Sequence, residues 1–406
     1  MTQPNPGSLT SERLPSIGVL WLMLRLVLIV VVLTASAHRP ATGLETTVAV
    51  WPPGPSAGQW LQRVLIEPWL RWDTEYYVKI ATRGYRLDDG TAQFHPLFPW
   101  AGRGIGYVLG GNMGAGLLVV SSVCGLLFLY AFERLAQLDL PAAIARRASV
   151  FLLHAPLAFI LFTPYTESMF LLCSVTALLM ARRGSWWMAG VAGGLAVLTR
   201  QQGIFLLVPL AWEFWEWSGR EWRNVAQHWP KAFSLGLIPA GLLFWVTFRA
   251  IALGDVAFEL NRPRTWIYGL MISNTATRVV PEQEFVMPWR ALQAALDHPR
   301  PTTRVDLILG SLFLLMLAAG ARFLWRLRPS YLLYSGVIIL VSFSYFTGYW
   351  QPYMGLPRHC FLAFPLFLPL AAWADRPKLI MAMLGIGLIG LMALAFFYSA
   401  HSVWVP

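Results

Sequence analysis

The sequence is poor in charged residues, which occupy 13% of its 406 positions against about 25% in a typical soluble domain. Hydrophobic residues occupy 57% of the chain, and 20 Trp and 24 Phe are spread along it. This apolar surface exceeds what one compact core can bury, so most of it is expected to face lipid. The composition therefore excludes a soluble protein and predicts an all-α polytopic membrane protein.

Cysteines, metal motifs and glycosylation sites are also scarce. Cys124, Cys173 and Cys360 all lie in apolar runs and lack the spacing of a zinc site or a disulfide framework. The sequence contains no H-E-x-x-H or D-x-D motif, so nothing in it requires a metal, and no cofactor is predicted. It also contains no Asn-x-Ser/Thr site, which favours a prokaryotic source.

The net charge of +11 comes mainly from arginine, which supplies 28 of the 31 basic residues. Most of these arginines lie in short gaps between apolar runs, where membrane orientation explains them better than binding to nucleic acid does. If the N-terminus is cytoplasmic, every inside gap is basic. The short outside gaps then hold little beyond Arg200 and Arg358. The charges therefore predict a protein of the cell membrane with a cytoplasmic N-terminus.

The apolar runs predict about eleven crossing segments, taking roughly 17 to 25 residues per crossing. Residues 1–406 then form one integral membrane domain with two long extracytoplasmic loops, over 38–103 and 252–304. The first segment ends like a cleaved secretory signal, but its length and Arg25 favour a retained helix. The segments are expected near residues 17–35, 104–132, 148–162, 168–181, 186–199, 203–217, 232–251, 305–324, 330–347, 359–374 and 379–399.

Both long loops are predicted to contain short helices. Apolar residues over 59–72 recur at helical spacing, as in a helix that lies in the membrane interface. A second helix is expected over 74–83 with Gly84 as its C-cap, and Pro288 is expected to open a helix over 289–297. Asp73 has two interpretations that are compatible with each other: it caps the helix over 74–83, and it is a positioned general base.

Four ordered stretches of the chain form a recognisable pattern. The first is W-D-x-x-x-Y-x-x-I-A-x-x-G-Y over 72–85, followed by F-H-P-L-F-P over 94–99. The others are T-P-Y-T-E-S over 163–168, T-R-Q-Q-G over 199–203, and P-R-H over 357–359 with F-P-L over 364–366. This pattern resembles the PIG-V family, the mannosyltransferases that add the second mannose of glycosylphosphatidylinositol anchors. His359 departs from the tyrosine that is usual in the family.

The resemblance implies a prokaryotic-type homologue with a GT-C-type bundle, whose first extracytoplasmic loop carries the catalytic motif. Asp73 would take the acceptor proton, while Arg200 and Arg358, together with His359, would hold the donor phosphate. The arginines have an alternative role, which is snorkelling to lipid headgroups. Glu167 either caps the next helix through its neighbours, or binds acceptor hydroxyls and assists Asp73.

Further polar and aromatic residues are candidates for substrate binding. His95 is a secondary candidate, because a histidine in such a stretch is more often a hydrogen-bonded structural residue. Arg25 is expected either to pair with an acidic or carbonyl partner in the bundle or to face the path of the lipid phosphate. Most charges of the second loop are expected to be solvated, although Trp266 or Trp289 would suit stacking on a pyranose ring. The substrate-binding candidates are Trp72, Tyr76, Tyr77, His95, Tyr165, Gln201 and Trp266.

The sequence thus predicts a monomeric inverting glycosyltransferase whose site opens to membrane lipids on the extracytoplasmic side. Its donor would be a polyprenyl-phosphate-linked sugar, mannose by resemblance, and its acceptor a glycolipid, an envelope glycan or a protein. One carboxylate base without a covalent intermediate implies inversion at the anomeric carbon. The alternatives are a transporter or flippase for a lipid-linked or anionic solute, which would require paired internal repeats, and a pseudo-enzyme scaffold.

Overall fold

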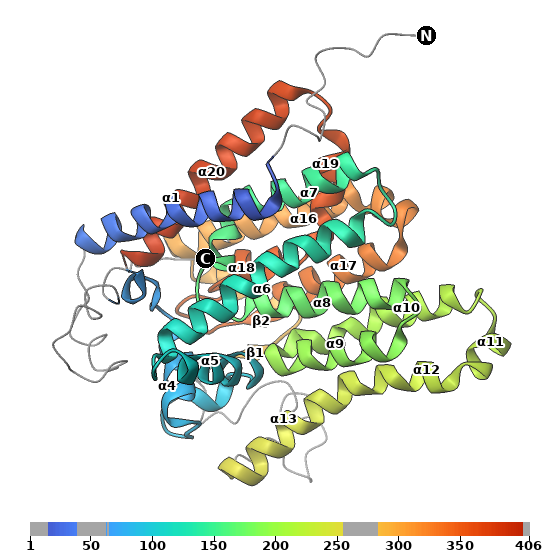
Figure 1. Cartoon of the computed structure of the whole chain (residues 1–406), viewed down its shortest axis with the longest axis horizontal. Helices are drawn as coiled ribbons and strands as arrows, with labels where there is room; N and C mark the ends of the chain where they lie inside the picture. Colours follow the sequence, from blue (N-terminus) through green and yellow to red (C-terminus); the bar gives the residue numbers. More distant parts are fainter. Residues whose placement is uncertain (1–14, 39–61, 63–64, 255–282, 401–406) are drawn as a thin grey trace.

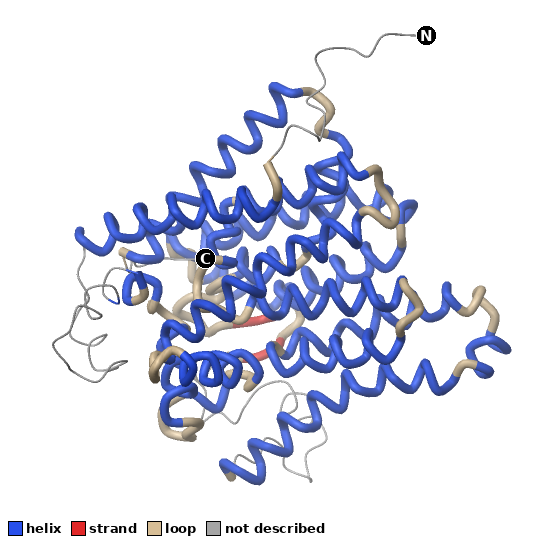
Figure 2. The backbone as a smooth tube through the Cα atoms, in the orientation of Figure 1, coloured by secondary structure: helices blue, strands red, loops and turns tan. Residues whose placement is uncertain are grey.

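The computed structural model describes residues 15–38, 62, 65–254 and 283–400 of the chain. Figure 2 shows that these residues are helical almost throughout. A single pair of two-residue strands is present among them, β1 (Glu284–Phe285) and β2 (Tyr345–Phe346), which are antiparallel with Glu284 opposite Phe346. The predicted all-α class is therefore confirmed, with this short ladder as an addition.

The chain folds into α-helices, with short 3₁₀ helices between some of them. Figure 1 shows the arrangement of the α-helices. The α-helices are α1 (Ile17–His38), α4 (Thr74–Arg83), α5 (Leu97–Val108), α6 (Met113–Ala136), α7 (Ala142–His154), α8 (Glu167–Arg182), α9 (Trp186–Thr199), α10 (Leu207–Trp217), α11 (Trp222–Gln227), α12 (Trp229–Phe233), α13 (Leu237–Leu253), α15 (Pro288–Asp297), α16 (Pro301–Leu327), α17 (Pro329–Ser344), α18 (Leu356–Phe361), α19 (Phe367–Trp373) and α20 (Pro377–Ser399). The 3₁₀ helices are η2 (Glu67–Trp69), η3 (Thr91–Gln93), η4 (Pro156–Leu161), η5 (Gln201–Leu206), η6 (Ser234–Gly236) and η8 (Phe364–Leu366).

Within the described residues, 5 helical stretches are long and apolar enough to cross a membrane. They are α1, α6, the α12–α13 stretch over 229–253, α16 and α20. Most of the residues in these stretches are not buried inside the protein, except in α6, where half are buried. Such exposed apolar helices require lipid around them. The chain is therefore a membrane protein.

The remaining predicted segments are shorter or interrupted helices. The segment predicted over 104–132 is two helices, α5 and α6, because the chain turns at residues 109–112 and Asn112 caps α6 by accepting a hydrogen bond from the Ala115 amide at 2.9 Å. The segments predicted near 148–162 and 359–374 are likewise interrupted, by Pro156, which begins the 3₁₀ helix η4, and by Pro365, which lies in the 3₁₀ helix η8. Both prolines are present in the sequence, but averaging hydropathy over the roughly 17 to 25 residues of one crossing does not reveal an interruption of the helix.

The first long loop agrees with its prediction after Asp73 and is only partly described before it. In the described part of 59–72, Gln62 and Leu65 are helical and Glu67–Trp69 forms the short 3₁₀ helix η2, while residues 59–61 and 63–64 lie outside the described residues. Trp69 is buried rather than interfacial. The Arg25 guanidinium lies 4.6 Å from its ring centre and donates to the Phe162 carbonyl at 2.6 Å. Arg25 thus pairs within the bundle, with a carbonyl, which is one of the two roles expected for it. Beyond Asp73, the helix Thr74–Arg83 is confirmed, and Gly84, at φ 86°, closes it as predicted.

The core lies where N-terminal and C-terminal helices meet. Phe128 and Phe132 of α6 pack edge-on against Phe364 of η8, with ring centres 5.6 and 5.3 Å apart. Ser36 of α1 hydrogen-bonds Ser399 of α20 at 2.9 Å. The helix predicted after Pro288 is also present as α15, and its Ala291 and Ala295 are buried. These contacts join stretches more than 200 residues apart into one bundle.

Buried ion pairs tie together the end of the bundle away from α4. Arg182, at the end of α8, donates to both carboxylate oxygens of Asp139 at 2.7 Å. Arg328, before α17, lies 2.6 Å from Glu213 of α10. Figure 1 shows α4 and α11 at opposite ends of the molecule, and α8 runs between these ends.

Candidate functional site

The structure brings together four charged side chains that the sequence singled out: Asp73, Glu167, Arg200 and Arg358. Asp73 Oδ2 accepts a hydrogen bond from Arg358 Nη2 at 2.9 Å. Arg358 Nε lies 3.2 Å from Glu167 Oε1, and the same oxygen accepts from Arg200 Nη1 at 2.8 Å. The four groups therefore form a row of alternating charge, Asp73–Arg358–Glu167–Arg200, whose formal charges cancel.

Asp73 stands at the first position before α4, but its side chain does not cap that helix. It makes no capping hydrogen bond and points to Arg358 instead, so the interpretation of Asp73 as a simple N-cap is wrong. The preceding residue, Trp72, has a φ of 58°, which is uncommon for a bulky side chain and costs free energy. Strain directly beside the carboxylate fits a residue held in place for chemistry rather than for folding.

Glu167 is the most deeply buried member of the row, with 1% of its side chain exposed. It is the first residue of α8, directly after the turn that Pro164 makes between η4 and this helix. Its two oxygens are engaged by Arg200, Arg358 and the Thr166 hydroxyl, which donates to Oε2 at 3.3 Å. A carboxylate so enclosed is suited to holding the two arginines in place, and has little room for an acceptor hydroxyl.

Arg200 projects from a sharp turn between α9 and η5. Its backbone is extended, at φ −152° and ψ 143°, and the chain then folds back so closely that a Cβ on Gly203 would lie 2.3 Å from the Val197 backbone nitrogen. Glycine is therefore needed at this position of the T-R-Q-Q-G motif. Arg200 Nη1 also donates to the Thr166 hydroxyl at 2.8 Å, which fixes its guanidinium beside the start of α8.

Arg358 lies on the short helix α18, which Gly355 precedes in the left-handed conformation at φ 75°. Besides Asp73 and Glu167, its guanidinium contacts the face of Tyr165, with Cζ 4.8 Å from the ring centre. Tyr165 in turn packs edge-on against Tyr398 of α20, with ring centres 5.7 Å apart. The substrate-binding candidate Tyr165 thus lies in the site, with the face of its ring against the Arg358 guanidinium.

The other candidates of the first loop line the same region. Burial raises the pKa of the Tyr77 phenol, and the nearby charges of Asp73 and Glu167 raise it further, so Tyr77 stays a protonated donor. Burial, with a further contribution from Arg249, lowers the pKa of His95 to about 3. This histidine is therefore neutral at physiological pH and packs against Trp245, which agrees with its structural interpretation.

The remaining predicted residues have different surroundings. Tyr76 stacks on Phe94 with ring centres 4.9 Å apart, and Gln201 is half-buried at the start of η5. His359 is buried and faces Tyr345 at 5.7 Å between ring centres. Trp266, Arg262 and Arg264 lie outside the described residues.

Sequence reasoning missed Tyr345. The β1–β2 ladder brings Gln283 beside Tyr345, and the Gln283 amide donates to the Tyr345 hydroxyl and accepts from the Gln93 amide. These three residues therefore extend the site across the second long loop. No sequence signal identified them, because Tyr345 ends an apolar run and two-residue strands leave no periodicity to detect.

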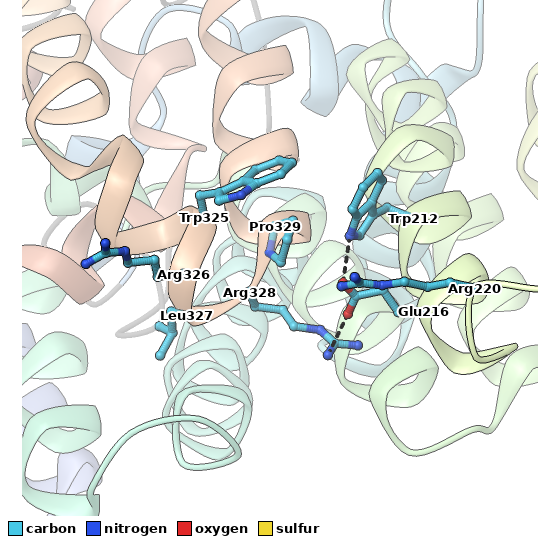
Figure 3. A pocket seen from close by; sticks show the side chains of 8 residues that line it. All are labelled: Trp212, Glu216, Arg220, Trp325, Arg326, Leu327, Arg328 and Pro329. Atoms are coloured by element: carbon cyan, nitrogen blue, oxygen red, sulfur yellow. Dashed lines mark hydrogen bonds and ion pairs between the residues drawn. The ribbon is translucent and has the colours of Figure 1, made fainter.

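A pocket of about 480 Å³ lies elsewhere, at the end of the bundle that contains Arg328 (Figure 3). Glu216 binds Arg220 at 3.0 Å and Arg328 at 2.7 Å, and Trp212 donates to it at 3.1 Å. The pocket shares no residue with the charged row. Its Glu216, Arg220 and Arg328 pair with one another, so these three charges are already compensated. The lining residues are Trp212, Glu216, Arg220, Trp325, Arg326, Leu327, Arg328 and Pro329.

The charged row can support one kind of chemistry in particular. Two guanidinium groups held on a common carboxylate suit a phosphate, since their planar N–H donors match its oxygens. Asp73, whose side chain is 35% exposed, is the member of the row that a reactant can approach. In the described part of the chain, no three His, Cys, Asp or Glu side chains come together as ligands for a metal ion.

Comparison with known proteins gives a sequence family and a fold. The family model described as mannosyltransferase (PIG-V) matches residues 18–244, more than half of the chain. This match includes Asp73, Glu167 and Arg200. No curated protein matches the chain in sequence.

Two solved structures of ArnT from Cupriavidus metallidurans resemble the chain. The apo structure is 15% identical with a TM-score of 0.50, over 92% of this chain and 63% of ArnT. The structure bound to undecaprenyl phosphate is 16% identical with a TM-score of 0.49, over 94% of this chain and 64% of ArnT. The chain spans slightly less than two thirds of the length of ArnT, and the likeness concerns the fold alone.

Proposed function

The chain belongs to the PIG-V mannosyltransferase family of GT-C glycosyltransferases, and we propose that it transfers mannose from a polyprenyl-phosphate donor to an acceptor hydroxyl on the extracytoplasmic face. The observation that carries this proposal is the row Asp73–Arg358–Glu167–Arg200, which joins a partly exposed carboxylate to Arg358 and, through Glu167, to Arg200. A group that takes a proton and groups that bind a leaving phosphate are the two requirements of this transfer.

The proposed reaction is a single displacement. Asp73 removes the proton of the acceptor hydroxyl while the oxygen of that hydroxyl forms a bond to the anomeric carbon of the donor. The bond between that carbon and the phosphate oxygen breaks, and the phosphate keeps the electron pair. Arg200 and Arg358 stabilise the negative charge that develops on it. Because one displacement inverts the anomeric carbon, a β-linked donor yields an α-linked product.

The remaining residues have supporting roles in this proposal. Glu167 holds both arginines, and the face of Tyr165 supports the Arg358 guanidinium. Tyr77 and Tyr345 are protonated donors at the edge of the row, suited to sugar hydroxyls. The acceptor is a glycolipid or an envelope glycan, bound from the side on which Asp73 is exposed.

The test is transfer of radiolabelled mannose from synthetic polyprenyl-phosphate-mannose by the purified full-length protein. Membrane lipid and envelope glycan fractions serve as acceptors, and both the labelled product and the released polyprenyl phosphate are measured. We expect Asp73→Asn to lower the rate by about 10²- to 10⁴-fold, the usual contribution of a general base.

Glu75→Gln is the matched control for this experiment. Glu75 lies two residues away on α4 and pairs with Lys79 at 2.6 Å rather than with either arginine. It should retain the wild-type rate. An Asp73→Asn variant as active as wild type contradicts the assignment of the base. Absence of any released phosphate from wild type contradicts the proposed activity.

A further inference from the structure

The pairing of Asp73 with Arg358 has a consequence for the order of events in the proposed reaction. Arg358 is expected to bind the donor phosphate, and one of its nitrogens donates to Asp73 at 2.9 Å. The base and the leaving group therefore compete for one guanidinium. The Asp73 oxygen that accepts this hydrogen bond is occupied by the guanidinium rather than by the proton of an acceptor hydroxyl.

The two carboxylates of the row are held unequally. Glu167 contacts both arginines and the Thr166 hydroxyl, and only 1% of its side chain is exposed. Asp73 contacts Arg358 alone among the arginines, and 35% of its side chain is exposed. Displacing Asp73 breaks one partly solvated contact, whereas displacing Glu167 would leave a buried charge without partners, which is far more costly.

The row is also balanced in charge before a ligand arrives. Two carboxylates face two guanidiniums, so a phosphate brings a third anion to two cations. Like charges at such short range repel each other strongly in a partly buried site. The repulsion acts on the anion that can leave most easily, and that anion is Asp73.

From these contacts we propose that the donor phosphate displaces Asp73 from Arg358, so that the carboxylate becomes a free base only when the donor is bound. This inference rests on the proposed function and adds to it a reason why the base acts only after the donor has bound. Phosphate moves onto Arg358, Asp73 turns toward solvent and the acceptor, and proton removal follows. Glu167 keeps Arg358 in place during the exchange, and donor binding precedes activation of the acceptor.

The test measures the affinity of the full-length protein in detergent for undecaprenyl phosphate, by native mass spectrometry at fixed ionic strength. Competition predicts that removing the competing charge strengthens binding. We expect Asp73→Asn to bind about three- to tenfold more tightly than wild type, as befits the loss of one partly exposed ion pair. Arg358→Gln should bind about tenfold more weakly.

Glu75→Gln controls for a general change in local charge, because its carboxylate is near Asp73 in sequence but is paired with Lys79. Its affinity should equal that of wild type. If Arg358→Gln weakens binding but Asp73→Asn binds no more tightly than wild type, the competition is refuted and the donor site stands. If wild type does not bind the lipid phosphate, or Arg358→Gln binds it equally well, the donor site fails as well.

Discussion

At the scale of single residues, the role of Glu167 is the most informative. The sequence left open whether it binds acceptor hydroxyls, assists Asp73 or helps to cap a helix. Its contacts with Arg200, Arg358 and Thr166 favour a positioning role, because each of its oxygens is already engaged. A residue that acts through the arginines has a different kinetic signature from one that touches the acceptor.

We expect Glu167→Gln to lower kcat by about 10- to 100-fold and to leave the KM for the acceptor unchanged. The variant keeps the shape of the side chain but removes the charge that orients both guanidiniums, so stabilisation of the leaving phosphate is lost. Steady-state kinetics with the acceptor identified in the transfer assay measure both constants. A rise in the acceptor KM at constant kcat would instead assign Glu167 to acceptor binding.

The charged residues of the site were predictable because charge is rare in this chain. Asp73, Glu167, Arg200 and Arg358 stood out in apolar surroundings, and all four meet in the structure. Their pairing was not predictable. Nothing in the sequence indicates that Trp72 adopts a φ of 58° or that Asp73 turns from the helix end toward Arg358, since both depend on contacts between distant segments.

At the scale of elements, the buried ion pair between Glu213 and Arg328 joins α10 to the junction of α16 and α17. Glu213 is 2% exposed, lies 2.6 Å from Arg328 and also accepts a hydrogen bond from the Ser330 hydroxyl at its Oε1. Arg328 also lies 2.7 Å from Glu216, so removing the Glu213 charge weakens the compensation of Arg328 without abolishing it, and the Ser330 hydroxyl loses a charged acceptor.

Glu213→Gln is therefore expected to lower the free energy of unfolding by about 2 kcal/mol, the usual contribution of a hydrogen bond to a charged group. The measurement is the apparent Tm of the purified protein in detergent, which should fall, whereas Glu221→Gln on the exposed surface should leave it unchanged. Equal Tm values for Glu213→Gln and wild type would mean that this junction does not depend on the ion pair.

The elements themselves were predicted unevenly. Helices with strong local signals agree closely: Thr74–Arg83 ends at Gly84, and the helix expected after Pro288 begins there. The apolar segments were found, but their internal breaks were not, because hydropathy measures affinity for lipid and not continuity of the backbone. The break between α5 and α6 depends on capping by Asn112, a local interaction that hydropathy averaged over a window cannot detect.

At the scale of the whole molecule, the two ends of the bundle carry different charged groups, and this difference predicts how the protein is oriented in the membrane. The candidate site lies at the α4 end, and the arginine-rich junctions Arg182 and Arg328 lie at the other. The positive-inside rule predicts that the arginine-rich end is cytoplasmic. The candidate site would then face the opposite side of the membrane.

This orientation can be tested by labelling intact cells with a membrane-impermeant maleimide. Asp88→Cys, on the exposed loop after α4, should react in intact cells. Arg223→Cys, on α11, should react only after the cells are permeabilised. Wild type controls for the native cysteines, of which Cys124 and Cys360 are buried. The reverse pattern would contradict the orientation and the proposed face of the reaction.

The length of α8 has a consequence for the membrane itself. Its 16 residues rise by about 1.5 Å each, so the helix is only about 24 Å long. It carries Glu167 at one end and Arg182 at the other, while a typical hydrocarbon core is about 30 Å thick. The helix is therefore about 6 Å shorter than that core. Three arrangements can make up the difference: local thinning of the bilayer, snorkelling of the Arg182 side chain to the headgroups, or protein that shields one charged cluster from the acyl chains.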